Sequence, residues 1–143
     1  MSPARRHLIT GLLAAGLLAG TASSATALVH FKSPSGNIGC IGDRTEVRCD
    51  IRQSSAKPPP KPKTCRFDWG TAYVVTPKAK RGRGLCASDT TLPTPGDRSI
   101  RAIAYGKSIR FGPLKCTSRR TGMTCRNRRG HGFTLSRQAI RLF

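Results

Sequence analysis

The hydrophobic residues beyond residue 30 occur in short stretches that glycine, proline and charged side chains interrupt every few positions. The clearest stretch is 71–76, where β-branched and aromatic residues follow one another, as is favoured in strands. No window of ten residues places its hydrophobic side chains at helical spacing. Short apolar runs between glycine and proline turns are typical of all-β proteins. We therefore expect an all-β fold, a small sandwich or barrel built from short hairpins with little helix.

The same pattern predicts further strands and the loops between them. The expected strands are 38–41 and 47–51, which pair as a hairpin, then 99–104, 108–111, a second hairpin over 114–126, and 132–135. Turn-forming residues predict loops over 31–37, over the basic stretch 78–84 and over 89–97. Residues 136–142 are expected to begin with a helical turn that Ser136 caps.

Residues 56–63 form a connector rich in proline and lysine, with four prolines among residues 57–63. Proline has a fixed φ and no backbone N–H, so this segment is excluded from helices and from the interior of a sheet. Extended polyproline II is the conformation expected here. We interpret the segment as a rigid linker within the domain. A docking peptide is the alternative, but most proline-binding domains are intracellular.

Residues 1–27 have the three parts of a secretory signal peptide. Two arginines near the start are followed by an uncharged apolar run at 8–20 and by the sequence Ala-Thr-Ala at 25–27. An apolar run of this length is shorter than the roughly 20 residues that cross a bilayer. We therefore expect a secreted, extracytoplasmic protein that is cleaved after Ala27. We expect residues 28–143 to form one domain without a transmembrane segment, and a monomer by default.

All six cysteines lie after the predicted signal peptide, which indicates disulfide bonds formed in an oxidising compartment. Eight residues separate the cysteines of each hairpin, and an even gap lets two side chains face each other across a tight turn. The remaining two cysteines are then left for each other. The predicted pairs are Cys40–Cys49, Cys65–Cys86 and Cys116–Cys125.

These pairings require tight turns, which the sequence centres on Arg44-Thr45 and on Arg120-Thr121, with Gly122 free to adopt positive φ. The alternative for the cysteines is a structural zinc site. Such sites place two cysteines two to four residues apart, and no pair here has that spacing. We therefore expect disulfides, no metal and no cofactor.

The charge of the chain is strongly positive and unevenly distributed. Without Arg5 and Arg6, 24 lysines and arginines face six acidic residues, a net charge of +18. Asp97 is the last acidic residue, and residues 98–143 contain 12 basic residues. Charge on this scale favours a polyanionic partner. Outside a cell the candidates are phosphate-containing wall polymers, acidic lipid headgroups and released nucleic acid, and a solvated basic surface without a ligand is the alternative.

The candidate anion-binding residues are arginines of the second hairpin and of the loop after it, namely Arg119, Arg120, Arg126, Arg128 and Arg129. We expect them to hold an anionic envelope polymer or an acidic membrane surface. No nucleic-acid recognition motif accompanies them. Any affinity for nucleic acid is therefore expected to be non-specific and sensitive to salt.

Motifs for catalysis are absent from the sequence, including the nucleophile elbow, the HExxH zinc motif and the phosphate loop. A triad of Ser35 or Ser136 with His131 and Asp68 can be written, but no spacing supports it. A histidine between two glycines is more typical of a turn. We assign no catalytic residue and expect a non-catalytic protein, with a hydrolase as the less favoured alternative.

Three short motifs occur in a fixed order along residues 31–143. They are S-P-S-G-N-I-x-C, which ends at Cys40, C-x-x-D-W-G, which begins at Cys65, and G-H-G-F-x-L-S-R at 130–137. This order resembles a family of small exported actinobacterial domains of unknown function. The resemblance implies export and paired cysteines, and it supplies no activity.

The motif residues suggest a candidate ligand site, and they also have an interpretation as residues that build turns and bends. The candidate site consists of Asn37, Asp68, Trp69, His131, Phe133 and Arg137. We thus expect a secreted or envelope-associated binding domain for an anionic extracellular polymer. The alternative is a secreted inhibitor or effector that binds a partner protein through the loops that carry the motifs.

Overall fold

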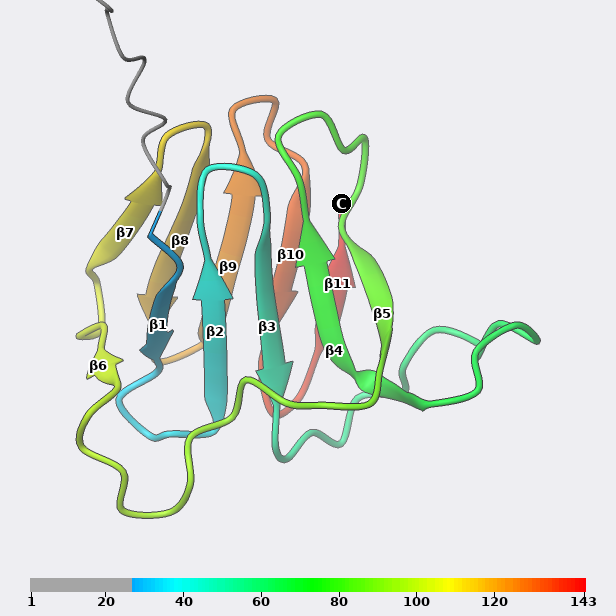
Figure 1. Ribbon diagram of the computed structural model, residues 1–143, viewed down its shortest axis with the longest axis horizontal. Coiled ribbons are helices and arrows are strands. Elements are labelled where there is room, and N and C mark those ends of the chain that lie inside the picture. Colours follow the sequence, from blue (N-terminus) through cyan, green and yellow to red (C-terminus); the bar gives the residue numbers. More distant parts are fainter. Residues whose placement is uncertain (1–26) are drawn as a thin grey trace, which may run out of the picture.

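The computed structural model describes residues 27–143, and these residues form two packed β-sheets without a helix (Figure 1). The expected all-β sandwich is therefore confirmed, and the two separate sheets favour the sandwich over the barrel. Among the described residues there is no helix with the length and apolar character needed to span a bilayer. The predicted signal peptide lies outside the described residues, apart from Ala27.

The first sheet, sheet A, contains six strands in the order β5-β4-β3-β2-β1-β6. All neighbours are antiparallel except β1 and β6, which run parallel. The strands are β1 Val29–Lys32, β2 Ile38–Gly42, β3 Val47–Ile51, β4 Asp68–Val75, β5 Arg83–Ala87 and β6 Arg101–Ala102.

The second sheet, sheet B, contains five strands in the order β11-β10-β9-β8-β7, and all of its pairs are antiparallel. Its strands are β7 Ser108–Phe111, β8 Leu114–Arg119, β9 Gly122–Asn127, β10 Gly132–Leu135 and β11 Ile140–Leu142. Figure 1 shows this sheet lying behind sheet A, with β7 behind the β1 side and β10 behind the β4 side.

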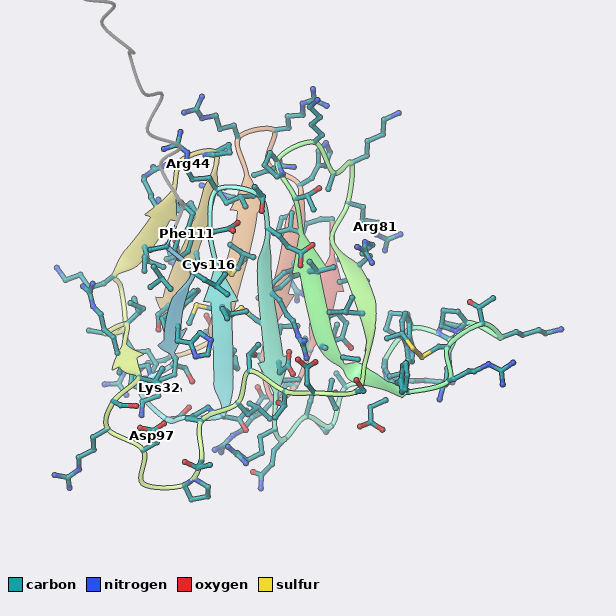
Figure 2. The ribbon with its side chains drawn as sticks, viewed as in Figure 1. Lys32, Arg44, Arg81, Asp97, Phe111 and Cys116 are labelled. Carbon is teal, nitrogen blue, oxygen red and sulfur yellow. A yellow bond between two sulfur atoms is a disulfide. The ribbon has the colours of Figure 1, made fainter. Side chains whose placement is uncertain are left out.

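Three contacts along the interior hold the two sheets together. On one side, Phe31 of β1 meets Phe111 of β7 with ring centroids 5.7 Å apart. On the other side, Tyr73 of β4 meets Phe133 of β10 at 6.4 Å. Between the aromatic pairs lie the hairpin cysteines, because Cys40 and Cys49 stand between Phe31 and Tyr73 in the register of sheet A. The Cys49 sulfur contacts that of Cys125 in sheet B at 3.6 Å, and Cys116, the partner of Cys125, is labelled in Figure 2. Burial of the side chain raises the pKa of Tyr73 to about 12, because the charged phenolate would lose its hydration, and the neutral hydroxyl donates to the Gly70 carbonyl oxygen at 2.9 Å.

The disulfides join the pairs that the spacing predicts, Cys40–Cys49, Cys65–Cys86 and Cys116–Cys125. The first and third each link directly opposed residues of a hairpin, with a Cα–Cα distance of 4.1 Å. Both predicted turn centres are present, and Gly122 has a φ of 131°. Three disulfides in one small domain indicate an oxidising, extracellular environment.

Two strands of sheet A were not predicted from the sequence. Residues 31–37 were expected to form a loop, but Phe31 and Lys32 belong to β1, which pairs with β2. Residues 78–84 were also expected to form a loop, but β5 begins at Arg83 and pairs with β4. Both strands depend on a partner strand that provides most of their backbone hydrogen bonds. The strand expected at 99–104 is reduced to the two residues of β6.

The expected helical turn at 136–142 was wrong. The Ser136 hydroxyl does accept the N–H of Ala139 at 2.9 Å, as a cap would. The chain then reverses, however, and β11 pairs with β10 along Ile140–Leu142. The edge of β10 offers unpaired backbone groups to these residues, and that pairing replaces the helix.

The connector at 56–63 has neither helix nor strand, as expected. It projects at one side of the sandwich (Figure 1), and the Cys65–Cys86 bridge links the chain just after it to β5. The Trp69 indole N–H donates to the Pro59 carbonyl oxygen at 2.7 Å and so fastens the connector to β4. This lobe lies outside the main core, since the packed core cluster contains the four hairpin cysteines but neither Cys65 nor Cys86, and Cys86 is only half-buried.

Mild reduction should therefore open the Cys65–Cys86 bridge first, because the hairpin sulfurs become accessible only when the sandwich itself opens. The measurement is stepwise reduction, alkylation of the free thiols and mass spectrometry of the peptides. A Cys65→Ala/Cys86→Ala variant serves as the control and should resist the same reductant. Early labelling of Cys116 or Cys125 would contradict this order.

Candidate functional site

The outer face of sheet B is lined by basic and hydroxyl side chains. In β8 the alternate residues Leu114, Cys116 and Ser118 are buried, so the residues between them point outward. The same alternation holds in β7, β9 and β11, and in β10 from Phe133 to Leu135. We call this surface the basic face; its side chains are Ser108, Arg110, Lys115, Thr117, Arg119, Thr124, Arg126, Thr134 and Arg141.

Three positive side chains form a row across the basic face. Arg110 of β7 lies directly opposite Lys115 of β8, and Lys115 lies directly opposite Arg126 of β9. Like charges at directly opposed positions destabilise a sheet. Residues 98–143 contain no acidic side chain to offset them. The fold alone gives no reason for this arrangement, so the row is a candidate for anion binding.

The next row of the same face carries hydroxyl groups. Ser108 and Thr117 lie in register, and their side-chain oxygens are 2.8 Å apart. Thr124 and Thr134 continue the row on β9 and β10, again with a hydroxyl–hydroxyl distance of 2.8 Å. Arg141 ends the row on β11. The basic groups are thus flanked by neutral donors that suit the oxygen atoms of an anionic ligand.

The outer face of sheet A differs from the basic face, because a loop that follows β5 covers part of it and supplies an acidic partner to one of its arginines. Arg48 of β3 pairs with Asp50 at 2.8 Å and with Asp89 of this loop at 2.7 Å. The hydrogen bond from Arg48 holds the pKa of the Asp89 carboxyl below its ordinary value. All six acidic residues belong to sheet A or to its connections. The acidic side chains are therefore confined to the sheet A side of the molecule, whereas basic side chains occur on both sides.

The covering loop approaches sheet A closely at Gly39. The Thr91 hydroxyl donates to the Gly39 carbonyl oxygen at 2.7 Å, and a Cβ on Gly39 would lie 2.3 Å from the Thr91 carbonyl oxygen. Lys32 donates to the Asp97 carbonyl oxygen at the far end of the loop, where both residues are labelled in Figure 2. The loop is therefore fixed over sheet A, and the basic face has no such cover in the described chain.

The structure divides the predicted anion-binding residues into three groups. Arg119 and Arg126 belong to the basic face, and Arg120 lies in the turn between β8 and β9. Arg128 and Arg129 lie in the loop between β9 and β10, at the other end of the same strands. Arg128 lines a hollow of about 360 Å³ together with three members of the basic face, Arg110, Lys115 and Arg126.

Sequence reasoning missed Arg110, Lys115 and Arg141 as members of this surface. The available signal was the spacing of basic residues by even numbers along strands, as in Lys115 and Arg119 of β8. Even spacing places side chains on one face of a strand, and the cysteine between them identifies the face that points inward.

The six residues of the candidate ligand site do not meet. Asn37 and Arg137 line one pocket at the end of the sandwich where β9 begins. His131 lies beyond the opposite end of β9, and Phe133 is fully buried in the core. Asp68 and Trp69 begin β4, and Trp69 lines a separate groove beside β5.

Several of these motif residues build the fold. The Asn37 side chain donates to the Gln53 carbonyl oxygen at 3.1 Å and accepts the Gln53 N–H at 3.0 Å. Gly130 has a φ of 84°, and a Cβ on Gly132 would lie 1.9 Å from the Cys125 carbonyl oxygen. These positions support the interpretation that the motifs partly serve turns and bends.

The sulfur atoms of Cys49, Cys116 and Cys125 lie within 4.8 Å of one another at the centre of the core. This cluster arises because two disulfides are stacked, with the Cys49 and Cys125 sulfurs 3.6 Å apart. Sulfur in a disulfide has no thiolate charge with which to bind a metal ion. The cluster therefore belongs to the packing of the sandwich.

Comparison with known proteins gives one match. The model of a family described as a family of unknown function, DUF6636, covers residues 11–143. No curated protein and no solved structure matches the chain. The match agrees with the resemblance of the motifs to a family without an assigned activity.

The positive charges of Arg110, Lys115 and Arg126 repel one another, so removing the central charge, that of Lys115, should stabilise the fold. Lys115→Gln is expected to raise the free energy of unfolding by up to about 1 kcal/mol at low ionic strength, since two like-charge pairs are relieved. The gain should shrink in high salt, which screens the repulsion. Denaturant unfolding measures it, with Lys80→Gln in the exposed β4–β5 loop as the control. If Lys115→Gln and Lys80→Gln change the free energy of unfolding equally, repulsion between the three residues of the row does not destabilise the fold.

Proposed function

The chain belongs to the family of unknown function DUF6636, and we propose that it is a secreted or envelope-associated binding domain for an anionic extracellular polymer. The polymer lies against the basic face, and the protein performs no catalytic step. The observation that carries this proposal is the row Arg110–Lys115–Arg126, in which three positive charges are directly opposed without a carboxylate nearby.

The dimensions of the basic face suit a chain of repeated charges. Adjacent strands are about 4.8 Å apart, so the three side chains of the row extend over roughly 10 Å. Lys115 and Arg119 are four residues apart on β8, which is about 13 Å along the strand. The positive groups therefore cover an area on which several charges of one linear polyanion can be neutralised together.

The energetic reasoning also favours a polymer over a single small ion. Exposed ion pairs contribute only about 0–1 kcal/mol each. A polymer makes several such contacts at once and releases its condensed counterions, so its affinity grows with the number of basic groups engaged. A surface of many exposed basic groups is therefore better matched to a polyanion.

The absence of a catalytic step is part of the proposal, and the positions of the acidic residues support it. Asp50 and Asp89 pair with Arg48. Asp43 and Asp97 accept hydrogen bonds within turns, which lower the pKa of both carboxyls, chiefly through Thr45 and Ser99 respectively. These four carboxylates serve sheet A and its connections, on the other side of the molecule from the basic face.

A second candidate function is docking on a partner protein. The observation in its favour is the groove of about 590 Å³ beside β5, which Trp69, Pro59 and Pro62 help to line. Phe67 lies nearby in the chain and is 56% exposed. This function would use the lobe around the Cys65–Cys86 bridge and would not require the basic face.

The binding experiment uses soluble polyphosphate as the anionic polymer and measures affinity between about 50 and 200 mM salt. The Lys115→Gln/Arg126→Gln variant should bind more weakly, and each lost contact should reduce the slope of log affinity against log salt by about 1. The matched control, Arg66→Gln/Lys78→Gln, removes the same charge from exposed loops of sheet A.

Two outcomes would contradict the proposal. One is an affinity for polyphosphate that does not depend on salt. The other is an equal loss of affinity in the control variant, which would mean that net charge and not the basic face determines binding. Repeating the titration with vesicles that contain an acidic lipid distinguishes a membrane surface from a polymer in solution.

A further inference from the structure

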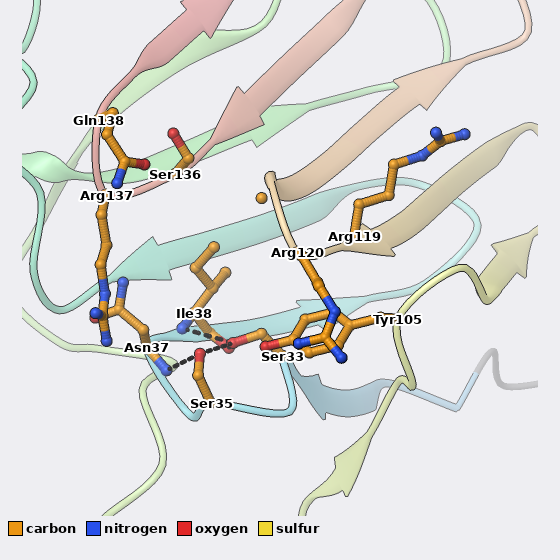
Figure 3. A pocket seen from close by; sticks show the side chains of 11 residues that line it. Ser33, Ser35, Asn37, Ile38, Tyr105, Arg119, Arg120, Ser136, Arg137 and Gln138 are labelled. Atoms are coloured by element: carbon orange, nitrogen blue, oxygen red, sulfur yellow. Dashed lines mark hydrogen bonds between the residues drawn. The ribbon is translucent and has the colours of Figure 1, made fainter.

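Four connections meet at the end of the sandwich where β9 begins. They are the β1–β2 loop, the β6–β7 loop, the β8–β9 turn and the β10–β11 loop. Together they enclose a pocket of about 310 Å³, which we call the end pocket (Figure 3). The S-P-S-G-N and L-S-R motifs, about a hundred residues apart in the chain, both contribute side chains to it.

The lining of the end pocket is rich in hydrogen-bond donors. Figure 3 shows Arg137 and Arg120 entering from two sides, with the hydroxyls of Ser33 and Ser35 between them. No carboxylate is among the lining residues, so neither guanidinium is neutralised there. Two positive groups around hydroxyls form an environment suited to a compact anion.

The framework of the pocket is held by hydrogen bonds within the protein. Ser33 Oγ accepts the N–H of Ile38 at 3.1 Å and lies 3.2 Å from Ser35 Oγ. The Arg137 carbonyl oxygen accepts the N–H of Ser55 at 2.7 Å. The Asn37 carbonyl oxygen accepts the N–H of Arg52 at 2.9 Å. The β1–β2 and β10–β11 loops are therefore both tied to the segment that follows β3.

Arg120 is also oriented before any ligand arrives. Its guanidinium carbon lies 5.0 Å from the centroid of the Tyr105 ring, within the range of a cation–π interaction. The side chain is otherwise exposed. Contact with the ring reduces the number of conformations that Arg120 must give up on binding, which favours affinity.

We propose that the end pocket binds one phosphate group of the polymer that lies across the basic face. This inference rests on the proposed function. The end pocket and the basic face are adjacent in the structure, because Arg119 at the end of β8 and Gly122 at the start of β9 line the pocket and also belong to strands of the face. The end pocket recognises one phosphate group of the polymer through hydrogen bonds, and the side chains of the basic face neutralise the remaining charges.

The geometry favours phosphate over carboxylate. A carboxylate is planar, and a single guanidinium satisfies both of its oxygens. A phosphate group presents tetrahedrally arranged oxygens to donors that approach from several directions. In the end pocket, donors come from the β1–β2 loop, from Arg120 in the β8–β9 turn and from Arg137 in the β10–β11 loop.

The experiment titrates the protein with glycerol 3-phosphate and, separately, with glycerate at constant ionic strength, followed by amide NMR shifts. Saturable shifts at Ser35, Gly122 and Gln138 are expected with the phosphate ester, and much weaker binding is expected with the carboxylate. Inorganic phosphate as a third probe shows whether the free ion is bound as well as the ester. Absence of saturable binding, or equal affinity for glycerate, would overturn the inference.

Variants locate the bound group. Arg120→Gln/Arg137→Gln should weaken binding of glycerol 3-phosphate at least about tenfold, because charge-assisted hydrogen bonds are lost. The matched control is Arg66→Gln/Arg83→Gln, two exposed arginines, one just before β4 and one in β5 of sheet A. If the control variant loses as much affinity for glycerol 3-phosphate, net charge determines the binding, and the proposed phosphate site in the end pocket is wrong. The unfolding midpoint of each variant confirms that the fold is intact.

A second pair of variants tests the role of Tyr105 as a positioning residue. Tyr105→Phe retains the ring beneath Arg120 and should bind glycerol 3-phosphate nearly as well as the original chain. Tyr105→Ala should bind about two- to fivefold more weakly, as expected for an exposed cation–π contact. Similar losses in both variants would show that the hydroxyl is required and that the ring is not.

The failure of this inference can be distinguished from the failure of the proposed function. Suppose that Arg120→Gln/Arg137→Gln binds glycerol 3-phosphate unchanged, while Lys115→Gln/Arg126→Gln no longer binds polyphosphate. In that case the proposed phosphate site in the end pocket is wrong, and the proposed binding of a polyanion by the basic face is supported. If polyphosphate binding is insensitive to both sets of substitutions, the proposed function fails as well.

Discussion

The stacking of two disulfides in the core determines which side chains this protein presents to solvent. The Cys49 and Cys125 sulfurs are 3.6 Å apart, and each belongs to a bridge between directly opposed residues of a hairpin. With Cys116 opposite Cys125 and both pointing inward, Lys115 must lie opposite Arg126 on the outer side. A slip by one residue would reverse every side chain of the pair. The bridge therefore fixes the register of the basic face.

The same bridge explains how the fold tolerates its own electrostatic repulsion. Closing a loop of about ten residues contributes roughly 2.7 kcal/mol in the chain-entropy model. Each directly opposed like-charge pair costs on the order of 0.2–1 kcal/mol, and the row contains two such pairs. The covalent link thus more than offsets the row Arg110–Lys115–Arg126. A core held by sulfur and by two aromatic pairs leaves the outer surface of sheet B free to carry charge that a less constrained sheet would avoid.

Local patterns predicted the hairpins and their bridges, because an even spacing of cysteines and a turn between them are visible in ten residues of sequence. Strands β1 and β5 were not predicted, because they are stabilised by backbone hydrogen bonds to partner strands, which a local sequence pattern does not reveal. The basic excess after Asp97 was evident, but which of these residues share one face could be worked out only from the inward position of Cys116. The end pocket could not be predicted, since it depends on four connections meeting in space. Motif residues such as Asn37 had two interpretations from the sequence, a ligand site or a role in building turns, and the hydrogen bonds between the Asn37 amide group and the backbone of Gln53 support the second.

The central claim is that this domain binds a polyanion with one face of one sheet. Amide NMR shifts recorded during a titration with polyphosphate test it most directly, because they report each strand separately. The account predicts that the largest shifts fall on β7, β8 and β9, around Arg110, Lys115 and Arg126, and that β2–β5 of sheet A remain nearly unchanged. Shifts concentrated on sheet A, or around the groove at Trp69, would contradict it.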